Sequence, residues 1–150
     1  MIVTRGRRTE AQALAKVMYI SIRHGAHRYS ALERRAWVPK IQSARNFAKV
    51  FTRHDVWVAR SCLGPQGFIA VRRDGYVNLV FVLPTAQGCG LFKRLMQRVE
   101  NTYPGALTVH ASLHAEAPFA AIGFQVLHRE RVKRNGQVLR RCFMQRGQSR

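Results

Sequence analysis

The chain has 150 residues, of which 47% are hydrophobic, and both numbers fit one domain with a proper core. No apolar run approaches the roughly 20 residues that a membrane-spanning helix requires, so we expect no membrane association. The three cysteines, Cys62, Cys89 and Cys142, form no CxxC pair, and an odd count argues against a disulfide framework. A reducing, cytoplasmic compartment is the simplest interpretation.

The charge of the chain is unusual, because 26 Lys and Arg residues stand against seven Asp and Glu, a net +19. Such a field concentrates polyanions, which makes nucleic acid, CoA and acidic protein surfaces candidate partners. The basic residues are spread along the chain without a basic tail: Arg5, Arg7, Arg8, Arg34, Arg35, Arg72, Arg73, Arg129, Arg131, Lys133, Arg134, Arg140, Arg141, Arg146 and Arg150. A solvated basic surface and a polyanion-binding face are equally open.

Helical patterns occupy the first third of the chain, after a short edge strand over residues 1–4. Apolar residues at helical spacing predict a helix over residues 10–24. Its arginine-rich start is also typical of a transit peptide, but Glu10 and the scarcity of serine argue against one. Ser30 and Glu33 form a capping-box pattern for a helix that ends at Trp37, before Pro39. A third helix is expected over residues 43–52.

Extended patterns follow. Residues 56–62, 68–72 and 76–83 are predicted strands of an antiparallel meander, separated by glycine-containing turns at 64–67 and 74–75. After a long helix that begins near Leu91, we expect a strand over residues 107–111 and a short helix over 115–122. The dipeptide Asn135-Gly136 predicts a final hairpin of strands 124–133 and 138–144. The fold class is therefore mixed α+β, one domain with a mostly antiparallel sheet covered by helices on both faces.

The stretch Tyr76–Glu100 reads as a strand, a glycine turn and a helix. Pro84 ends the strand, because proline has no amide to give to a sheet. Gln87, Gly88, Cys89 and Gly90 form the turn. A helix that begins directly after two glycines presents unpaired amides and the positive end of its dipole. The residues alone therefore predict a site for an anion such as a phosphate.

Three segments carry a resemblance to a known family: VFVLPTAQGCGLFKRLM (80–96), SLHAEAPFAAIGF (112–124) and YISIRHGAHRYSALERRAW (19–37). In this order and spacing, the chain resembles the GNAT superfamily of acetyl-CoA-dependent N-acetyltransferases. The resemblance implies the GNAT fold, a single splayed sheet with helices on both faces, and acetyl-CoA as cofactor. It also implies transfer of an acetyl group to a primary amine of a small molecule or a protein by direct attack.

The resemblance assigns roles by position. Backbone amides of Gln87, Gly88, Cys89, Gly90, Leu91 and Phe92 would hold the CoA pyrophosphate. Phe81 and Val82 would pair with the pantetheine arm where a bulge splays the sheet. Ser112 would lie beside the cofactor and Phe119 near the thiol.

Four residues depart from the family pattern. Gln87 replaces the commoner arginine, which the pattern allows. Phe92 stands where glycine or alanine is usual, and its ring would either crowd the pyrophosphate or rotate into the core. Phe119 stands where many members have the tyrosine that protonates the departing thiolate, and phenylalanine has no proton to donate. Asn78 stands where the subgroup often has an acid, and it can orient an amine without accepting its proton.

Histidines are then the candidate bases. His110 lies on the strand just before Ser112 and titrates in the required range, although an ordinary strand histidine facing core or solvent is the alternative. His24 and His27 are candidates for the acceptor pocket or exposed loop residues. Tyr29 and Trp37 either form walls of that pocket or pack between helices. We expect no metal site.

Two other functions stay open. The net charge of +19 favours a GNAT domain that acts on a nucleic-acid-linked amine such as aminoacyl-tRNA. The departures at Asn78, Phe92 and Phe119 favour a non-catalytic module that binds CoA or a polyanion. A monomer and a homodimer are both compatible with the sequence.

Overall fold

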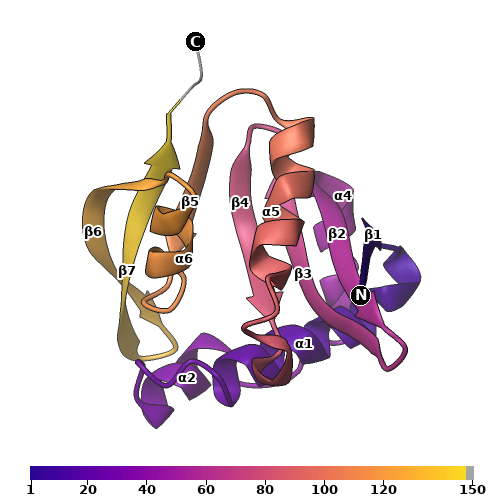
Figure 1. The fold of residues 1–150 in the computed structure, drawn as a ribbon. Helices are drawn as coiled ribbons and strands as arrows, with labels where there is room; N and C mark the ends of the chain where they lie inside the picture. The colour runs from indigo at the N-terminus through magenta and orange to yellow at the C-terminus, as the bar shows by residue number, and fades with distance from the viewer. Residues whose placement is uncertain (148–150) are drawn as a thin grey trace.

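The computed structural model describes residues 1–147 and contains one seven-stranded sheet in the order β1-β2-β3-β4-β5-β7-β6. Every neighbouring pair is antiparallel except β4 with β5. The strands are β1 (Ile2–Arg5), β2 (His54–Ser61), β3 (Gly64–Arg72), β4 (Tyr76–Val82), β5 (Leu107–Ala111), β6 (Gln125–Arg134) and β7 (Gln137–Arg146). The mixed α+β class with a mostly antiparallel sheet is confirmed (Figure 1).

Helices cover both faces of the sheet. They are α1 (Ala11–Arg23), α2 (Ala31–Trp37), α3 (Ala44–Phe47), α4 (Val50–Arg53), α5 (Leu91–Thr102) and α6 (Glu116–Ala121), with 3-10 turns η1 (Arg8–Glu10) and η2 (Pro84–Ala86). The predicted capping box of α2 is present, because Ser30 Oγ accepts from the Glu33 amide and Glu33 accepts from the Ser30 amide. The single helix expected over residues 43–52 is instead two short helices, α3 and α4. Among residues 1–147, no helix has the length and apolarity to cross a bilayer.

Strand β2 shows how the two hydrophobic layers arise, because its successive side chains point to opposite faces. Val56 and Val58 pack with α1 and Phe47 of α3. Trp57 and Ala59 pack with α5 and, further along the same layer, with Phe119 of α6. The middles of β2 and β3 are therefore buried on both faces, whereas β4 is mostly half-buried.

The sheet parts between β4 and β5. Only two residue pairs join these strands, Tyr76 with Thr108 and Val77 with Val109. On its other side β4 pairs Leu79 with Ala70 and Val77 with Val71, which leaves Asn78 as an extra residue, a β-bulge. The bulge directly follows the last pair with β5, so the two strands diverge from Asn78 toward α1 and α2 (Figure 1).

Gly75 closes the joined end of the two strands. Its carbonyl accepts from the Thr108 amide at 3.1 Å, and its φ is +89°. A Cβ at this position would lie 2.7 Å from the Ala106 carbonyl oxygen, closer than any real contact. The approach of β5 to β4 therefore requires glycine here.

The β6–β7 hairpin is fastened to the helices at two points. Asn135 Nδ2 donates to the Ala36 carbonyl of α2 at 2.6 Å. The buried Tyr29 hydroxyl donates to the Arg140 carbonyl at 2.6 Å and accepts from the Leu113 amide at 3.0 Å. The predicted Asn135-Gly136 turn is present, with positive φ values of 47° and 84°. These contacts fix the hairpin over the open side of the parted strands.

We predict that Gly75→Ala destabilises the protein by about 1–3 kcal/mol more than Gly64→Ala. Both glycines have positive φ, so both variants carry the left-handed strain, but a Cβ at Gly64 meets nothing within 4 Å. The difference between the two free energies of unfolding, measured by urea denaturation, isolates the close approach to Ala106. Equal losses would contradict the role given to Gly75.

Candidate functional site

Two cavities lie where β4 and β5 part. The first has a volume of about 380 Å³ and is lined by the end of β4, the turn into α5, the start of α6 and the α1–α2 connection. The second, of about 290 Å³, is lined by β4, β5, α1, α2 and the β6–β7 hairpin. Three residues line both: Trp37, Phe81 and Ser112. We call these the junction residues, because they belong to the linings of both cavities.

The glycine turn forms one end of the first cavity. Gly88 and Gly90 have φ values of +83° and +76°, and a Cβ added to either would meet nothing within 4 Å. Within residues 1–147 no side chain caps the start of α5, so its first amides are left to solvent or to a ligand. The structure therefore has the features that the anion-site prediction requires.

Most residues expected around the cofactor line the first cavity: Phe81, Val82, Gln87, Gly88, Gly90, Leu91, Phe92 and Ser112. Two do not. Cys89 is an exposed residue of the turn. Phe119 has no exposed surface and belongs to the core on the α5 side of the sheet.

Phe92 explains the burial of Phe119. The two rings meet edge to face with centroids 4.9 Å apart, and Phe119 makes a similar contact with Phe124. Phe92 is half-buried, packs against the core and still lines the first cavity. Of the two alternatives for its ring, the structure therefore favours rotation toward the core. Position 119 therefore carries no hydroxyl and lies in a cluster of aromatic rings.

The free edge of β4 already has polar partners. The Val82 carbonyl accepts from Ser21 Oγ and from Gln87 Nε2, each at 3.2 Å. Both donors are side chains, which can rotate away, whereas a neighbouring strand could not. A ligand with amide groups that lies along this edge therefore competes with Ser21 and Gln87 for one carbonyl.

The second cavity holds a connected pair of polar rings. Tyr76 Oη lies 2.7 Å from His110 Nδ1, and the two rings meet edge to face. The Nε2 atom of His110 lies 3.7 Å from a carboxylate oxygen of Glu130. Both ring nitrogens of His110 therefore have neighbours that can donate or accept a proton. His110 itself is among the residues that line the second cavity.

Charge and burial favour the neutral form of His110. Burial, and then the positive charge of Arg141, lower its pKa, and the positive charge of His128 acts in the same direction while Glu130 opposes them. Burial also raises the pKa of Tyr76, so its hydroxyl keeps its proton near neutral pH. The pair is thus a neutral base in contact with a neutral hydroxyl.

Asn78, at the bulge, also lines the second cavity. Its Nδ2 donates to His54 Nε2 at 2.9 Å, while His54 Nδ1 donates to the Val50 carbonyl at 2.8 Å. His54 of β2, itself bound to α4, therefore fixes the orientation of the Asn78 amide group.

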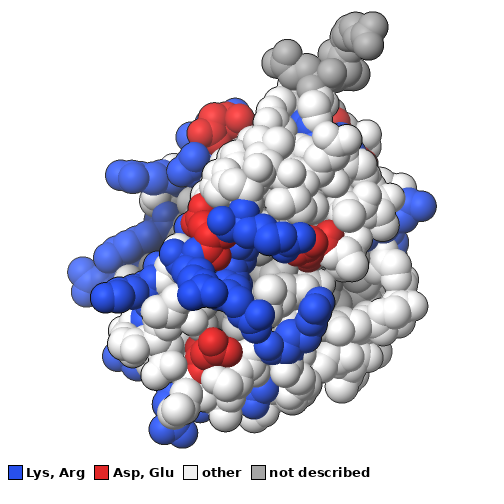
Figure 2. Space-filling view, turned by 90° about the vertical axis from the view of Figure 1, so that its left-hand side faces the viewer, with Lys and Arg blue, Asp and Glu red and all other residues white. Residues whose placement is uncertain are grey.

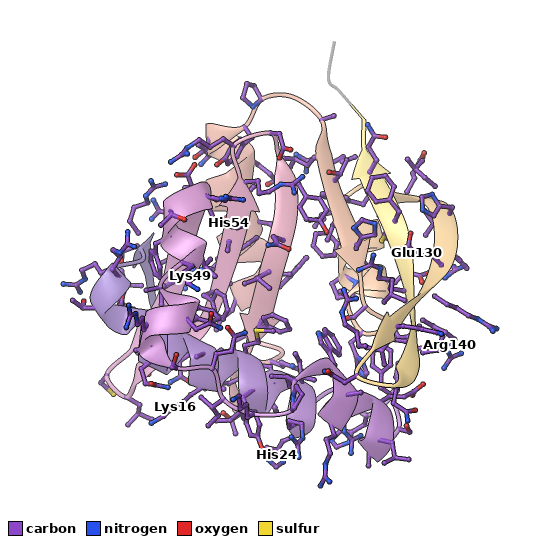
Figure 3. The ribbon with its side chains drawn as sticks, turned by 180° about the vertical axis from the view of Figure 1, so that it is seen from behind. Lys16, His24, Lys49, His54, Glu130 and Arg140 are labelled. Carbon is purple, nitrogen blue, oxygen red and sulfur yellow. The ribbon has the colours of Figure 1, made fainter. Side chains whose placement is uncertain are left out.

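Of the remaining residues predicted for the acceptor pocket, Tyr29 and Trp37 line the second cavity, whereas His24 and His27 do not. Tyr29 lines the second cavity and stacks edge to face on Trp37, with ring centroids 5.4 Å apart, so both have a packing role as well. His24 lines neither cavity and lies on the outside of the molecule at the end of α1 (Figure 3). His27 is exposed, and its Nε2 lies 2.9 Å from the His24 carbonyl.

Sequence reasoning missed several polar residues that line the cavities, among them Ser21, Tyr76, Arg134 and His114. Tyr76 and Asn78 are two residues apart on one strand, so their side chains point to the same face, and this alternation could have predicted Tyr76 as a neighbour of Asn78. Ser21, His114 and Arg134 come from a helix, a loop and a hairpin that meet only in the folded chain. His114 Nε2 accepts from the Arg28 amide at 3.1 Å, so its ring is part of this contact between loops.

Solved structures with the same fold include several acetyltransferases. A GCN5-related N-acetyltransferase from Rhodopseudomonas palustris has a TM-score of 0.85 at 23% identity, over 97% of this chain and 94% of that one. The putative acetyltransferase yncA from Salmonella typhimurium, solved with acetyl-CoA, has a TM-score of 0.74 at 17% identity, over 100% and 95%. A phosphinothricin acetyltransferase from Sinorhizobium meliloti, also with acetyl-CoA, has a TM-score of 0.73 at 18% identity, over 97% and 86%. At these identities the likeness concerns the fold.

A search of curated proteins finds no match to the chain. The family model described as "Acetyltransferase (GNAT) domain" matches residues 25–140, a range that includes α2, the parted strands, the glycine turn and most of the final hairpin. The chain therefore belongs to the GNAT acetyltransferase family.

Proposed function

We propose that the protein is an acetyl-CoA-dependent N-acetyltransferase that acts on a primary amine of a small molecule or a protein. One observation carries the proposal: two cavities on the two sides of the parted strands meet at Trp37, Phe81 and Ser112. Transfer between two substrates requires this arrangement, because each must reach the same point from its own side.

The first cavity fits the cofactor. The amides at the start of α5, after Gly88 and Gly90, would hold the pyrophosphate, and the free edge of β4 at Phe81 and Val82 would pair with the pantetheine arm. Acetyl-CoA supplies an acetyl group activated as a thioester. A pantetheine arm held at Phe81 and Val82 would bring the thioester toward the junction residues.

The second cavity would receive the amine. His110 is the proposed base, and Tyr76 Oη at 2.7 Å from its Nδ1 both orients the ring and offers a path for the proton. The proton passes from the amine to Tyr76 Oη while the Tyr76 proton moves to His110 Nδ1. Glu130, 3.7 Å from Nε2, stabilises the imidazolium that results.

Ser112 is the proposed donor at the junction, since position 119 has no hydroxyl. Its Oγ accepts from the Ala115 amide at 3.2 Å, which leaves its own proton free to donate. A CoA thiol is acidic enough to need little help in leaving. The loss of the usual tyrosine is therefore compatible with turnover.

Release of the CoA thiol from acetyl-CoA, measured over a panel of primary amines, tests the proposed function. We expect release that depends on the amine and saturates with its concentration. Tight binding of acetyl-CoA without release over the panel would overturn the proposal in favour of a non-catalytic CoA-binding module.

We predict that His110→Gln lowers kcat by about 100-fold or more, as expected for loss of a general base, with the Kd for acetyl-CoA unchanged. His128→Gln is the matched control, because His128 also contacts Glu130 but its side chain is 57% exposed. If both variants retain wild-type kcat, His110 is not the base.

The pH dependence has a definite sign. A base acts when neutral, so activity is retained above the pKa of His110 and lost as the pH falls through it. Burial and Arg141 lower that pKa, against a weaker opposing effect of Glu130, so we expect the acid limb of kcat below about 6.5. A limb above 7 in the wild type, or an unchanged limb in His110→Gln, would contradict the assignment.

The turn gives another prediction. Gly90→Ala should weaken acetyl-CoA binding about 10-fold or more, because its Cβ would occupy the open space where the pyrophosphate belongs and would disturb the amides that bind it. Gly136→Ala has the same positive-φ strain at the hairpin turn and should leave the Kd unchanged. Isothermal titration with acetyl-CoA measures both. Equal Kd values in the two variants would place the pyrophosphate elsewhere.

One observation favours a second function, in which the amine is carried on nucleic acid. Figure 2 shows basic side chains gathered over the β6–β7 side of the molecule. Arg131 and Arg140 face each other directly across the hairpin, a repulsive pair unless an anion lies near them. Binding of tRNA whose affinity falls steeply with salt would support this function, and no binding at low salt would exclude it.

A further inference from the structure

The second cavity has a positive lining without a compensating carboxylate. Among the described residues that line it there is no Asp or Glu, whereas three are arginines: Arg134, Arg140 and Arg141. Glu130 lies next to the cavity, but Arg141 holds it in an ion pair at 2.7 Å. Among residues 1–147, Arg134 has no carboxylate within ion-pair distance. Arg134 therefore gives the cavity an uncompensated positive charge.

The Arg134 guanidinium is available to a ligand. The side chain is exposed, and its contact within the chain is a hydrogen bond from Nη1 to the neighbouring Lys133 carbonyl at 3.2 Å. Its positive charge, like that of Arg141, favours the ionised form of Tyr76 and so acts on the hydroxyl that contacts His110. The charge thus acts at the proposed base.

The backbone at Arg134 is well fixed. The next residue, Asn135, has a φ of 47° in the hairpin turn. Its side chain donates to the Ala36 carbonyl at 2.6 Å, and this hydrogen bond joins the hairpin tip to α2. Strand alternation puts Arg134 on the same face of β6 as Glu130, toward the cavity, and Arg131 on the opposite face. A fixed backbone with a free guanidinium is a suitable arrangement for binding an anion.

This charge selects among amines. A polycationic amine finds no Asp or Glu among the described residues that line the cavity and is repelled by the unpaired charge of Arg134. An amine that also carries an anionic group gains a bidentate, charge-assisted hydrogen bond at a guanidinium. The same positive field lowers the pKa of the bound ammonium, which favours the neutral amine that can attack.

We propose that the acceptor is a primary amine that carries a carboxylate or phosphate group, and that Arg134 binds this group while the amine lies toward His110 and Ser112. This inference rests on the proposed acetyltransferase function and names the acceptor class of the same site. It places the anion at the hairpin edge of the second cavity and the amine at the junction with the first.

Matched pairs of amines test the inference. One pair is an α-amino acid and the amine that lacks only its carboxylate; the other is phosphoethanolamine and ethanolamine. We expect the anionic member to have a KM at least about 10-fold lower, with a parallel difference in Kd measured by titration without acetyl-CoA. The two pairs together distinguish a carboxylate from a phosphate as the preferred group.

Arg134→Gln should remove most of the preference within a pair, because the KM of the anionic member rises toward that of the uncharged member when the guanidinium is lost. Arg131→Gln removes the same charge from the opposite face of the same strand and should leave the preference intact. Turnover of wild type without preference for the anionic member, or an equal effect of the two variants, would overturn the inference while leaving the acetyltransferase function standing. Absence of turnover on every amine, with acetyl-CoA bound, would instead refute the proposed function.

Discussion

The bulge at Asn78 is the constraint on which the site depends. It follows the last residue pair between β4 and β5, and beyond it no strand of the described residues lies along the β5-facing edge of β4. Backbone amides and carbonyls need partners, so this free edge is a template for an extended ligand with amide groups. The Val82 carbonyl accepts hydrogen bonds from the side chains of Ser21 and Gln87. Both side chains can rotate away, so an amide group of a ligand can take their place.

The parting of the strands also divides the chemistry between two cavities of different character. The first is formed by glycine turns, helix amides and an apolar cluster in which Phe92 packs on Phe119. The second contains the Tyr76–His110 pair. Burial raises the pKa of Tyr76, and the positive charges of Arg141 and Arg134 oppose this with a smaller effect. Under the proposed function the first cavity would bind the cofactor and the second would take the proton of the amine, and the two share Trp37, Phe81 and Ser112 in their linings.

Local patterns in the sequence predicted much of the fold, because their physics is local. The capping box at Ser30 and Glu33, the glycine turn before α5 and the Asn135-Gly136 hairpin each involve residues within a few positions of one another. The Tyr76–His110 contact, 34 residues apart, depends on the register of two parallel strands, and the position of Arg134 depends on a hairpin held by α2. Neither can be read from spacing. The division of helix 43–52 and the burial of Phe119 likewise follow from packing against distant residues.

A crystal structure with bound CoA tests the central claim most directly. The claim predicts the pyrophosphate at the amides that follow Gly88 and Gly90, the pantetheine arm along β4 in place of Ser21 or Gln87 at the Val82 carbonyl, and the thiol between Phe81 and Ser112, open to the second cavity. CoA bound elsewhere on the basic surface, or a thiol that does not reach the junction residues, would contradict it.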